Sequence, residues 1–214
     1  MNTTTTDQFI STASEDLKYV GSRFLDYAVG DGILYNYEYS GGQFLDRGDP
    51  IDIGAPVGNQ SGGIYGQQVI NNLGNTVAVP IRDLVVPNPY TFGVNIRVFS
   101  YDESTNLWTQ KGNDISTNSG NSTTMKSFSI SPDGSKILAV FSVNDPPRTG
   151  QKNAFIAEYE FQSNDWVMSN FVPIYSGFNI QNTIQWSLQK NKTVLIIEQV
   201  AAIPGNYLKI KIFD

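Results

Sequence analysis

The sequence predicts an all-β fold, a four-bladed β-propeller whose blades are four-stranded antiparallel sheets. Short alternating apolar segments are separated by Gly, Pro, Asn and Asp clusters, and helical periodicity is nearly absent. Apolar residues also recur about every 60 positions, at Ile10, Ile70 and Ile130 and again at Leu17, Val77 and Ile137. A fixed period with four strands in each repeat is typical of propellers.

An aromatic-rich segment returns in each repeat and is predicted to be its third strand, because aromatic residues favour strands. These segments are residues 33–39, 95–101, 155–161 and 207–213. The repeats are therefore expected at 8–53, 63–117, 125–175 and 182–213, within one domain of residues 1–214. The alternative folds are a β-sandwich with accidental repetition and an open array of sheets.

The third repeat shows the strand order most clearly. Residues 127–131 alternate as a first strand, and 132–135 predict a tight turn. Residues 136–142 are apolar enough for a second strand buried on both faces. A long loop then leads to the third strand, and a fourth begins at Trp166.

The other repeats follow the same order. In the second, strands are expected at 65–71, 76–81, 95–101 and from Leu107 onward. In the first, they are expected near 9–11, 17–20, 33–39 and 43–45. In the fourth, only three are expected, at 182–188, 193–199 and 207–213.

The missing strand has a candidate replacement in the Thr-rich residues 2–6, which suit an outer strand. Pairing of 1–7 with 207–213 would close the ring through the N-terminal strand. Otherwise the open edge would bind another chain, which makes a homo-oligomer the alternative.

Two segments resemble known propeller repeats. Residues 128–140 resemble a hairpin of WD40-like propellers. Residues 95–101 followed by 108–115 are similar to the repeat of an integrin-like or galactose-oxidase-like group found in extracellular, algal, bacterial and viral proteins. The resemblance implies a propeller fold and a virion or extracellular surface setting.

The chemistry of those families does not follow. The pieces nearest to a calcium loop, at 30–32 and 144–145, offer too few spaced oxygen ligands. The copper site of galactose oxidase uses His and Cys, and this chain contains neither. We therefore expect no metal and no cofactor.

Composition narrows the function classes further. Without His or Cys, there is no His-dependent triad, disulfide or thiolate chemistry. A net charge of −6 disfavours nucleic acid and anionic membranes as partners. No apolar run approaches a membrane span, so membrane insertion is not expected, and the N-terminus does not resemble a secretory signal.

Carboxylates are the abundant acid-base groups. Those in or near the predicted loops between second and third strands are Asp26, Asp31, Asp83, Asp145 and Glu198. Propeller glycosidases place paired carboxylates at such a face. Solvated turn residues are the simpler interpretation, because no carboxylate has a companion that would shift its pKa.

The same loops hold other candidate binding residues. Arg82 and Arg148 could clamp an acidic group, or pair with the neighbouring acids. Tyr90 and Phe92 belong to an apolar, proline-rich loop that could contact a partner or cap its own blade. Three tryptophans are assigned to packing between blades rather than to sugar stacking: Trp108, Trp166 and Trp186.

These observations favour a non-enzymatic binding or structural module that contacts a protein or glycan partner through loops 82–94, 143–153 and 200–206. The candidate binding residues are Arg82, Asp83, Tyr90, Phe92, Asp145 and Arg148. The alternative is a carbohydrate-binding lectin or glycan-active enzyme that uses the same face.

Overall fold

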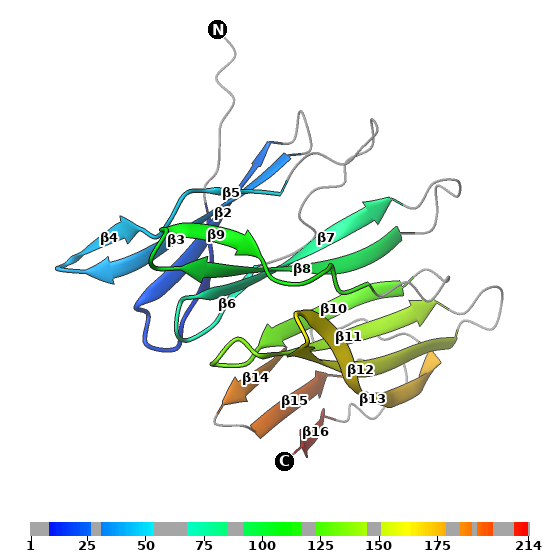
Figure 1. Ribbon diagram of the computed structural model, residues 1–214. Helices are drawn as coiled ribbons and strands as arrows, with labels where there is room; N and C mark the ends of the chain where they lie inside the picture. The colour runs from blue at the N-terminus through cyan, green and yellow to red at the C-terminus, as the bar shows by residue number, and fades with distance from the viewer. Residues whose placement is uncertain are drawn as a thin grey trace, which may run out of the picture. The chain divides into compact units, whose positions relative to one another are not determined.

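The computed structural model describes residues 9–26, 31–53, 68–84, 92–116, 123–144, 151–178, 185–189, 192–198 and 208–213. Every regular element in these ranges is a β-strand, and the strands form antiparallel sheets (Figure 1). The all-β prediction is confirmed. Among the described residues, no helix has the length and apolarity to cross a membrane.

Sheets I and II share one topology, in which each strand pairs with the next along the chain. Sheet I contains β1 (Phe9–Ala13), β2 (Tyr19–Asp26), β3 (Asp31–Ser40) and β4 (Gln43–Asp46), with β5 (Ile51–Asp52) also paired to β3. Sheet II contains β6 (Val69–Ile70), β7 (Thr76–Leu84), β8 (Phe92–Asp102) and β9 (Leu107–Gln110). A bridge between Ile96 and Ile115 takes the place of β5 in sheet II.

Sheets III and IV continue the same up-and-down order. Sheet III contains β10 (Thr123–Ile130), β11 (Lys136–Asn144), β12 (Gln151–Gln162) and β13 (Asp165–Phe178). Sheet IV contains β14 (Gln185–Gln189), β15 (Lys192–Glu198) and β16 (Leu208–Phe213). In the described part of the chain sheet IV has three strands, as expected. Residues 2–6, the predicted closing strand, lie outside the described residues.

The four sheets fall into two compact units. The first is Met1–Leu84 with Asn95–Ile115 and holds sheets I and II; the second is Val85–Val94 with Ser116–Asp214 and holds sheets III and IV. The core of the first unit lies between its two sheets. It is made by Tyr19, Leu34 and Ile51 from sheet I and by Ile70, Val77, Val79 and Phe99 from sheet II. In sheet III, residues 137–141 of β11 are all buried, which confirms a second strand buried on both faces.

One turn geometry joins the first two strands in sheets I, II and III. The backbone N–H of Ser14, Asn71 or Ser131 donates to the carbonyl five residues later, at 2.8, 3.0 and 2.9 Å. The side-chain oxygen of that first residue also accepts a hydrogen bond from the backbone N–H of the residue five positions later. A polar residue that bonds its own turn in this way favours a tight hairpin.

This turn corrects the predicted alignment of the first repeat. Leu17 occupies the position of Gly74 and Gly134, with φ of 58° against 64° and 71°, and its side chain is 66% exposed. The buried counterpart of Val77 and Ile137 is therefore Val20, three residues further along. A fixed spacing misplaced Leu17 because connections between sheets differ in length while the turn keeps its geometry.

The aromatic third strands are confirmed as equivalent in sheets I to III. The N–H groups of Tyr39, Tyr101 and Phe161 each donate to a carbonyl of the neighbouring turn, at 2.7 to 2.9 Å. Each ring then pairs with an aromatic residue of the fourth strand. The pairs are Tyr39–Phe44, Tyr101–Trp108 and Phe161–Trp166, with centroid distances of 5.1, 5.1 and 5.2 Å.

Candidate functional site

Only some of the predicted binding residues lie in the described part of the chain. Arg82 and Asp83 belong to β7, and Phe92 is the first residue of β8, so they flank a loop rather than lie in it. The loop expected at 82–94 is shorter, because β7 continues to Leu84 and β8 begins at Phe92, beyond the apolar segments from which the strands were predicted. Tyr90, Asp145 and Arg148 lie outside the described residues.

The other candidate carboxylates also lie on strands. Asp26 ends β2 and pairs across the hairpin with Asp31, the first residue of β3. Glu198 ends β15 and pairs with Leu208 of β16. Antiparallel pairing uses only backbone groups, so polar residues can continue a strand. The strands therefore extend beyond the apolar segments from which their ends were predicted.

Two tryptophans have the expected packing role. Trp108 packs against the core of the first unit and donates its indole N–H to the carbonyl of Arg47, at 2.7 Å. Trp166 is buried beside Phe161. Trp186 lies on β14, the first strand of its sheet, whereas Trp108 and Trp166 lie on fourth strands.

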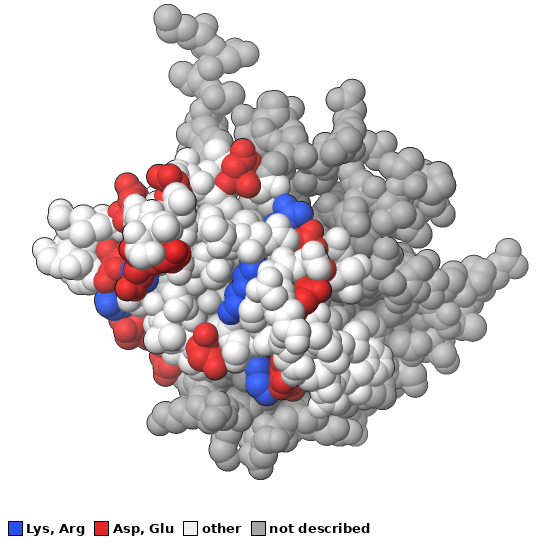
Figure 2. All heavy atoms as spheres, in the orientation of Figure 1, with Lys and Arg blue, Asp and Glu red and all other residues white. Residues whose placement is uncertain are grey.

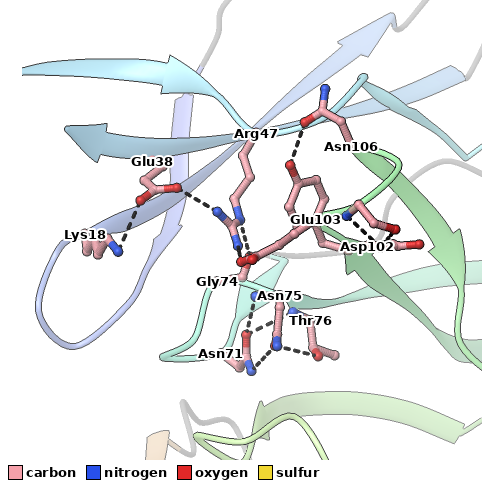
Figure 3. A network of polar contacts seen from close by, with 12 residues as sticks. Lys18, Glu38, Arg47, Asn71, Gly74, Asn75, Thr76, Asp102, Glu103 and Asn106 are labelled. Carbon is pink, nitrogen blue, oxygen red and sulfur yellow. Dashed lines mark hydrogen bonds and ion pairs between the residues drawn. The ribbon is translucent and has the colours of Figure 1, made fainter.

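The most developed polar site of the described residues surrounds Arg47, at the junction of sheets I and II (Figure 3). Its side chain is only 7% exposed. Arg47 donates to Glu38 at 2.6 Å, to Glu103 at 3.2 Å and to the carbonyl of Gly74 at 2.9 Å. Glu38 also binds Lys18, at 3.1 Å. The guanidinium therefore links sheet I to both the first turn and the third-strand turn of sheet II.

Aromatic rings complete this site. The guanidinium carbon lies 4.8 Å from the ring centroid of Tyr19 and 4.4 Å from that of Tyr101. A guanidinium held against aromatic faces gains cation–π attraction that grows as water is excluded. We call this arrangement the Arg47 clasp.

Two glycines make the clasp possible. Gly48 has φ of 73°, and a Cβ there would lie 2.9 Å from Trp108 and 3.0 Å from Tyr101. Gly74 has φ of 64°, and a Cβ there would lie 2.2 Å from the Tyr19 ring. The close approach of backbone to aromatic rings thus requires glycine at both positions.

A second ion pair also ties sheet II to sheet I. Arg97 binds Asp114 through two hydrogen bonds, at 2.8 and 2.7 Å, and donates to the carbonyl of Ile53 at 3.3 Å. The Asp114 carboxylate raises the pKa of Arg97 above its ordinary value. Bidentate geometry makes this pair stronger and more directional than an isolated surface contact.

Four carboxylates, two on turns and two on third strands, have lowered pKa values. Hydrogen bonds from Ser14 and Ser104 lower the pKa of Asp16 and Asp102, respectively. Burial raises the pKa of Asp133, but hydrogen bonds from Ser131 and Ser135 outweigh it and the net pKa is lower. The hydrogen bond from Lys136 lowers the pKa of Glu160. Such carboxylates stay ionised near neutral pH, which suits turns and ion pairs better than acid catalysis.

The outer part of sheet I carries exposed apolar side chains. Tyr39 is 48% and Phe44 51% exposed, and both flank the Gly41–Gly42 turn between β3 and β4. Figure 2 shows this hairpin tip, at the far left as in Figure 1, as an uncharged projection bordered by acidic side chains. The exposed acids of the nearby strands and turns include Glu15, Asp16, Asp46 and Asp49.

Sequence reasoning did not single out Arg47. A signal was present, since Arg47-Gly48 and Lys111-Gly112 follow equivalent fourth strands and both glycines have φ of 73°. The N–H of Arg47 donates to Asn36 and that of Lys111 to Val98, both at 2.8 Å, which confirms the equivalence. A basic residue before glycine, repeated at one place in two repeats, could have marked the clasp.

Comparison with known proteins supports the fold alone. No family model matches the chain, and no curated protein matches its sequence. Its structure is similar to that of acylaminoacyl peptidase from Pyrococcus horikoshii, with a TM-score of 0.53 and 9% identity over 97% of this chain and 31% of that one. It is also similar to the β-propeller domain of the Trilobed protease from Pyrococcus furiosus, described as having an open velcro topology, with a TM-score of 0.53 and 10% identity over 100% of this chain and 56% of that one.

The chain thus spans about a third of the peptidase and just over half of the protease propeller domain. Together with four successive antiparallel sheets, these similarities confirm a propeller fold. Identities near 10% carry no activity or partner from those proteins to this one.

Proposed function

We propose that this chain is a non-enzymatic binding module built as a four-bladed propeller. The observation that supports it best is the set of large apolar side chains exposed on third and fourth strands. In the first unit they include Tyr39 of β3, Phe44 of β4 and Leu107 of β9; in the second they are Val167, Met168 and Phe171 of β13. Exposed apolar side chains that gather on outer strands are typical of surfaces that contact other proteins.

The loops between second and third strands are the other proposed contact region. They join β7 to β8, β11 to β12 and β15 to β16, so each of the three loops leaves the second strand of its sheet and enters the third. Arg82, Asp83 and Phe92 lie at the base of the first of these loops. A virion or extracellular surface is the setting that we propose for this module, with a protein as the partner.

Selection of a random peptide library against the purified chain tests the proposal. We expect a selected peptide family whose dissociation constant rises at least tenfold in a loop variant, Arg82→Ala with Tyr90→Ala, or in an outer-strand variant, Phe171→Ala. The melting temperature of each variant must match that of the wild type. Peptides insensitive to every variant would contradict the proposal.

The competing carbohydrate function has a direct readout. A glycan array and hydrolysis assays on the same preparation would reveal a lectin or a glycan-active enzyme. Hydrolysis that is lost in Asp83→Asn, with binding of the selected peptides unchanged, would overturn the non-enzymatic role.

A further inference from the structure

The two sheets of the first unit differ in how one equivalent surface is covered. In sheet II, the surface made by the Gly74 turn, Tyr101 and Trp108 is occupied by Arg47 and Gly48. These two residues come from the turn that follows β4 of sheet I. The segment after a fourth strand therefore covers the aromatic pair of the adjacent sheet.

Among the described residues, no such segment covers the equivalent surface of sheet I. The repeat places Leu17 at the position of Gly74, Tyr39 at that of Tyr101 and Phe44 at that of Trp108. These three side chains are 66%, 48% and 51% exposed, respectively. Successive strand residues point to opposite faces, so Tyr39 points away from the face on which Glu38 binds Arg47. We call Leu17, Tyr39 and Phe44 the Tyr39 face.

We propose that the Tyr39 face binds a segment of a partner protein that presents a lysine or arginine followed by glycine, as Arg47-Gly48 does on sheet II. This inference rests on the proposed binding role. It adds a defined surface, at the opposite end of the β2 and β3 strands from their connecting loop, and a defined ligand chemistry.

Two features favour a cationic side chain in the partner: the exposed ring of Tyr39 and the charge of the surrounding side chains. The Tyr39–Phe44 pair has the same 5.1 Å centroid distance as Tyr101–Trp108, whose tyrosine ring holds the Arg47 guanidinium at 4.4 Å. The hairpin tip is uncharged (Figure 2). Of the charged side chains near it, acidic ones outnumber basic ones: Glu15, Asp16, Asp46 and Asp49 are exposed, and the neighbouring Lys18 is paired with Glu38. A cationic side chain therefore gains both cation–π attraction and long-range attraction to a chain of net charge −6.

The glycine is specified by the backbone approach seen on sheet II. A side chain at Gly48 would collide with both Trp108 and Tyr101, so a segment that lies this close to an aromatic pair needs glycine there. The chain's own residues 2–6, Asn-Thr-Thr-Thr-Thr, contain neither a cation nor a glycine. Their composition favours a segment from another protein.

The experiment uses the full chain and a capped peptide with the sequence of residues 107–113, Leu-Trp-Thr-Gln-Lys-Gly-Asn, which carries the second basic-glycine pair of the repeat. Binding is measured by calorimetry and by NMR of the tyrosine ring protons at low salt. We expect saturable binding that weakens at least tenfold when the peptide lysine is replaced by methionine or its glycine by valine.

Matched protein variants locate the binding. Tyr39→Ala and Phe44→Ala should each weaken binding at least tenfold, because each removes an aromatic ring of the proposed face. Both side chains are exposed, so their loss leaves the core intact. Leu45→Ala removes a similarly exposed side chain from the other face of β4 and should change affinity less than twofold. A melting curve for each variant confirms folding.

Four outcomes would overturn the inference: no binding, equal binding of the methionine peptide, equal loss in Leu45→Ala, or binding only after deletion of residues 1–8. The last would identify the chain's own N-terminal segment as the occupant. If the residue 107–113 peptide does not bind, the proposed contacts through the loops and β13 still stand. If the peptide selection fails instead, binding of the residue 107–113 peptide still tests the Tyr39 face separately.

Discussion

Arg47 of sheet I holds its guanidinium carbon 4.4 Å from the ring centroid of Tyr101 in sheet II. The same guanidinium donates to the Gly74 carbonyl and to Glu38, so one side chain joins the β-turns of two sheets. Because Arg47 is almost fully buried, its charge is stabilised by these partners rather than by water.

Arg47→Ala should therefore destabilise the first unit by about 3 kcal/mol, since it removes a buried charged contact and leaves the Gly74 carbonyl without its donor. Chemical denaturation followed by tryptophan fluorescence measures this, because Trp108 lies in the clasp. Glu103→Gln is the control: Glu103 is 82% exposed, and its contact with Arg47 should contribute under about 0.5 kcal/mol. Equal losses in the two variants would show that burial of Arg47 does not set the strength of the clasp.

Gly74→Ala should be far more damaging than Gly42→Ala. Both glycines have positive φ, but a Cβ at residue 74 would overlap the Tyr19 ring, whereas a Cβ at residue 42 meets nothing within 4 Å. Gly42→Ala should cost about 1 kcal/mol from backbone strain alone. Gly74→Ala adds displacement of Tyr19 from the core and should cost at least about 2 kcal/mol more. Thermal unfolding of the two variants, measured in parallel, compares their stabilities. Similar melting temperatures would refute the packing argument.

Asn36→Val should stabilise the chain. Asn36 is buried on β3, and neither its amide nitrogen nor its amide oxygen has a hydrogen-bond partner among the described residues. Val98, the equivalent residue of sheet II, is fully buried. Replacing an unsatisfied amide with valine should raise the free energy of unfolding by about 1 kcal/mol. A lower stability than wild type would mean that the amide is satisfied in solution.

Acid should destabilise the fold between about pH 5 and pH 3. The pKa values of Asp16, Asp102, Asp133 and Glu160 are lower in the folded chain than their ordinary values of 3.8 and 4.5. Their contribution is present above the ordinary values and is lost as the pH falls through the lowered ones, because the unfolded chain takes up protons first.

Asp133→Asn tests this origin. The variant lacks one of the four carboxylates, so its melting temperature should fall less steeply between pH 6 and pH 3 than that of the wild type. Parallel curves would assign the acid sensitivity to other groups.

Much of the fold could be predicted from local patterns. The Pro132–Ser135 turn and the apolar residues 137–141 identified a hairpin of sheet III because turn chemistry and strand burial are both local properties. Leu17 shows the limit: equal spacing placed it in a strand, whereas the turn places it at a left-handed position. Spacing along the chain does not measure the variable length of connections between sheets.

The candidate site was less accessible to sequence reasoning. The one signal for Arg47, a basic residue before glycine at the same place in two repeats, does not give its role, because that role depends on Tyr101 and Gly74, which come from another sheet. Conversely, Arg82 and Asp83 attracted attention as loop charges but lie on β7. Charge and residue type do not say which side chains a fold brings together.

By itself the sequence determined the strand order, the aromatic third strands and the exclusion of His- and Cys-dependent chemistry, because these follow from periodicity and composition. Only the tertiary structure decided that Arg47 is buried between two sheets while the equivalent surface of sheet I, at Tyr39 and Phe44, is exposed. The reason is physical: aromatic pairs at equivalent positions differ in exposure when one is covered by a neighbouring segment, and such cover depends on packing rather than on local sequence.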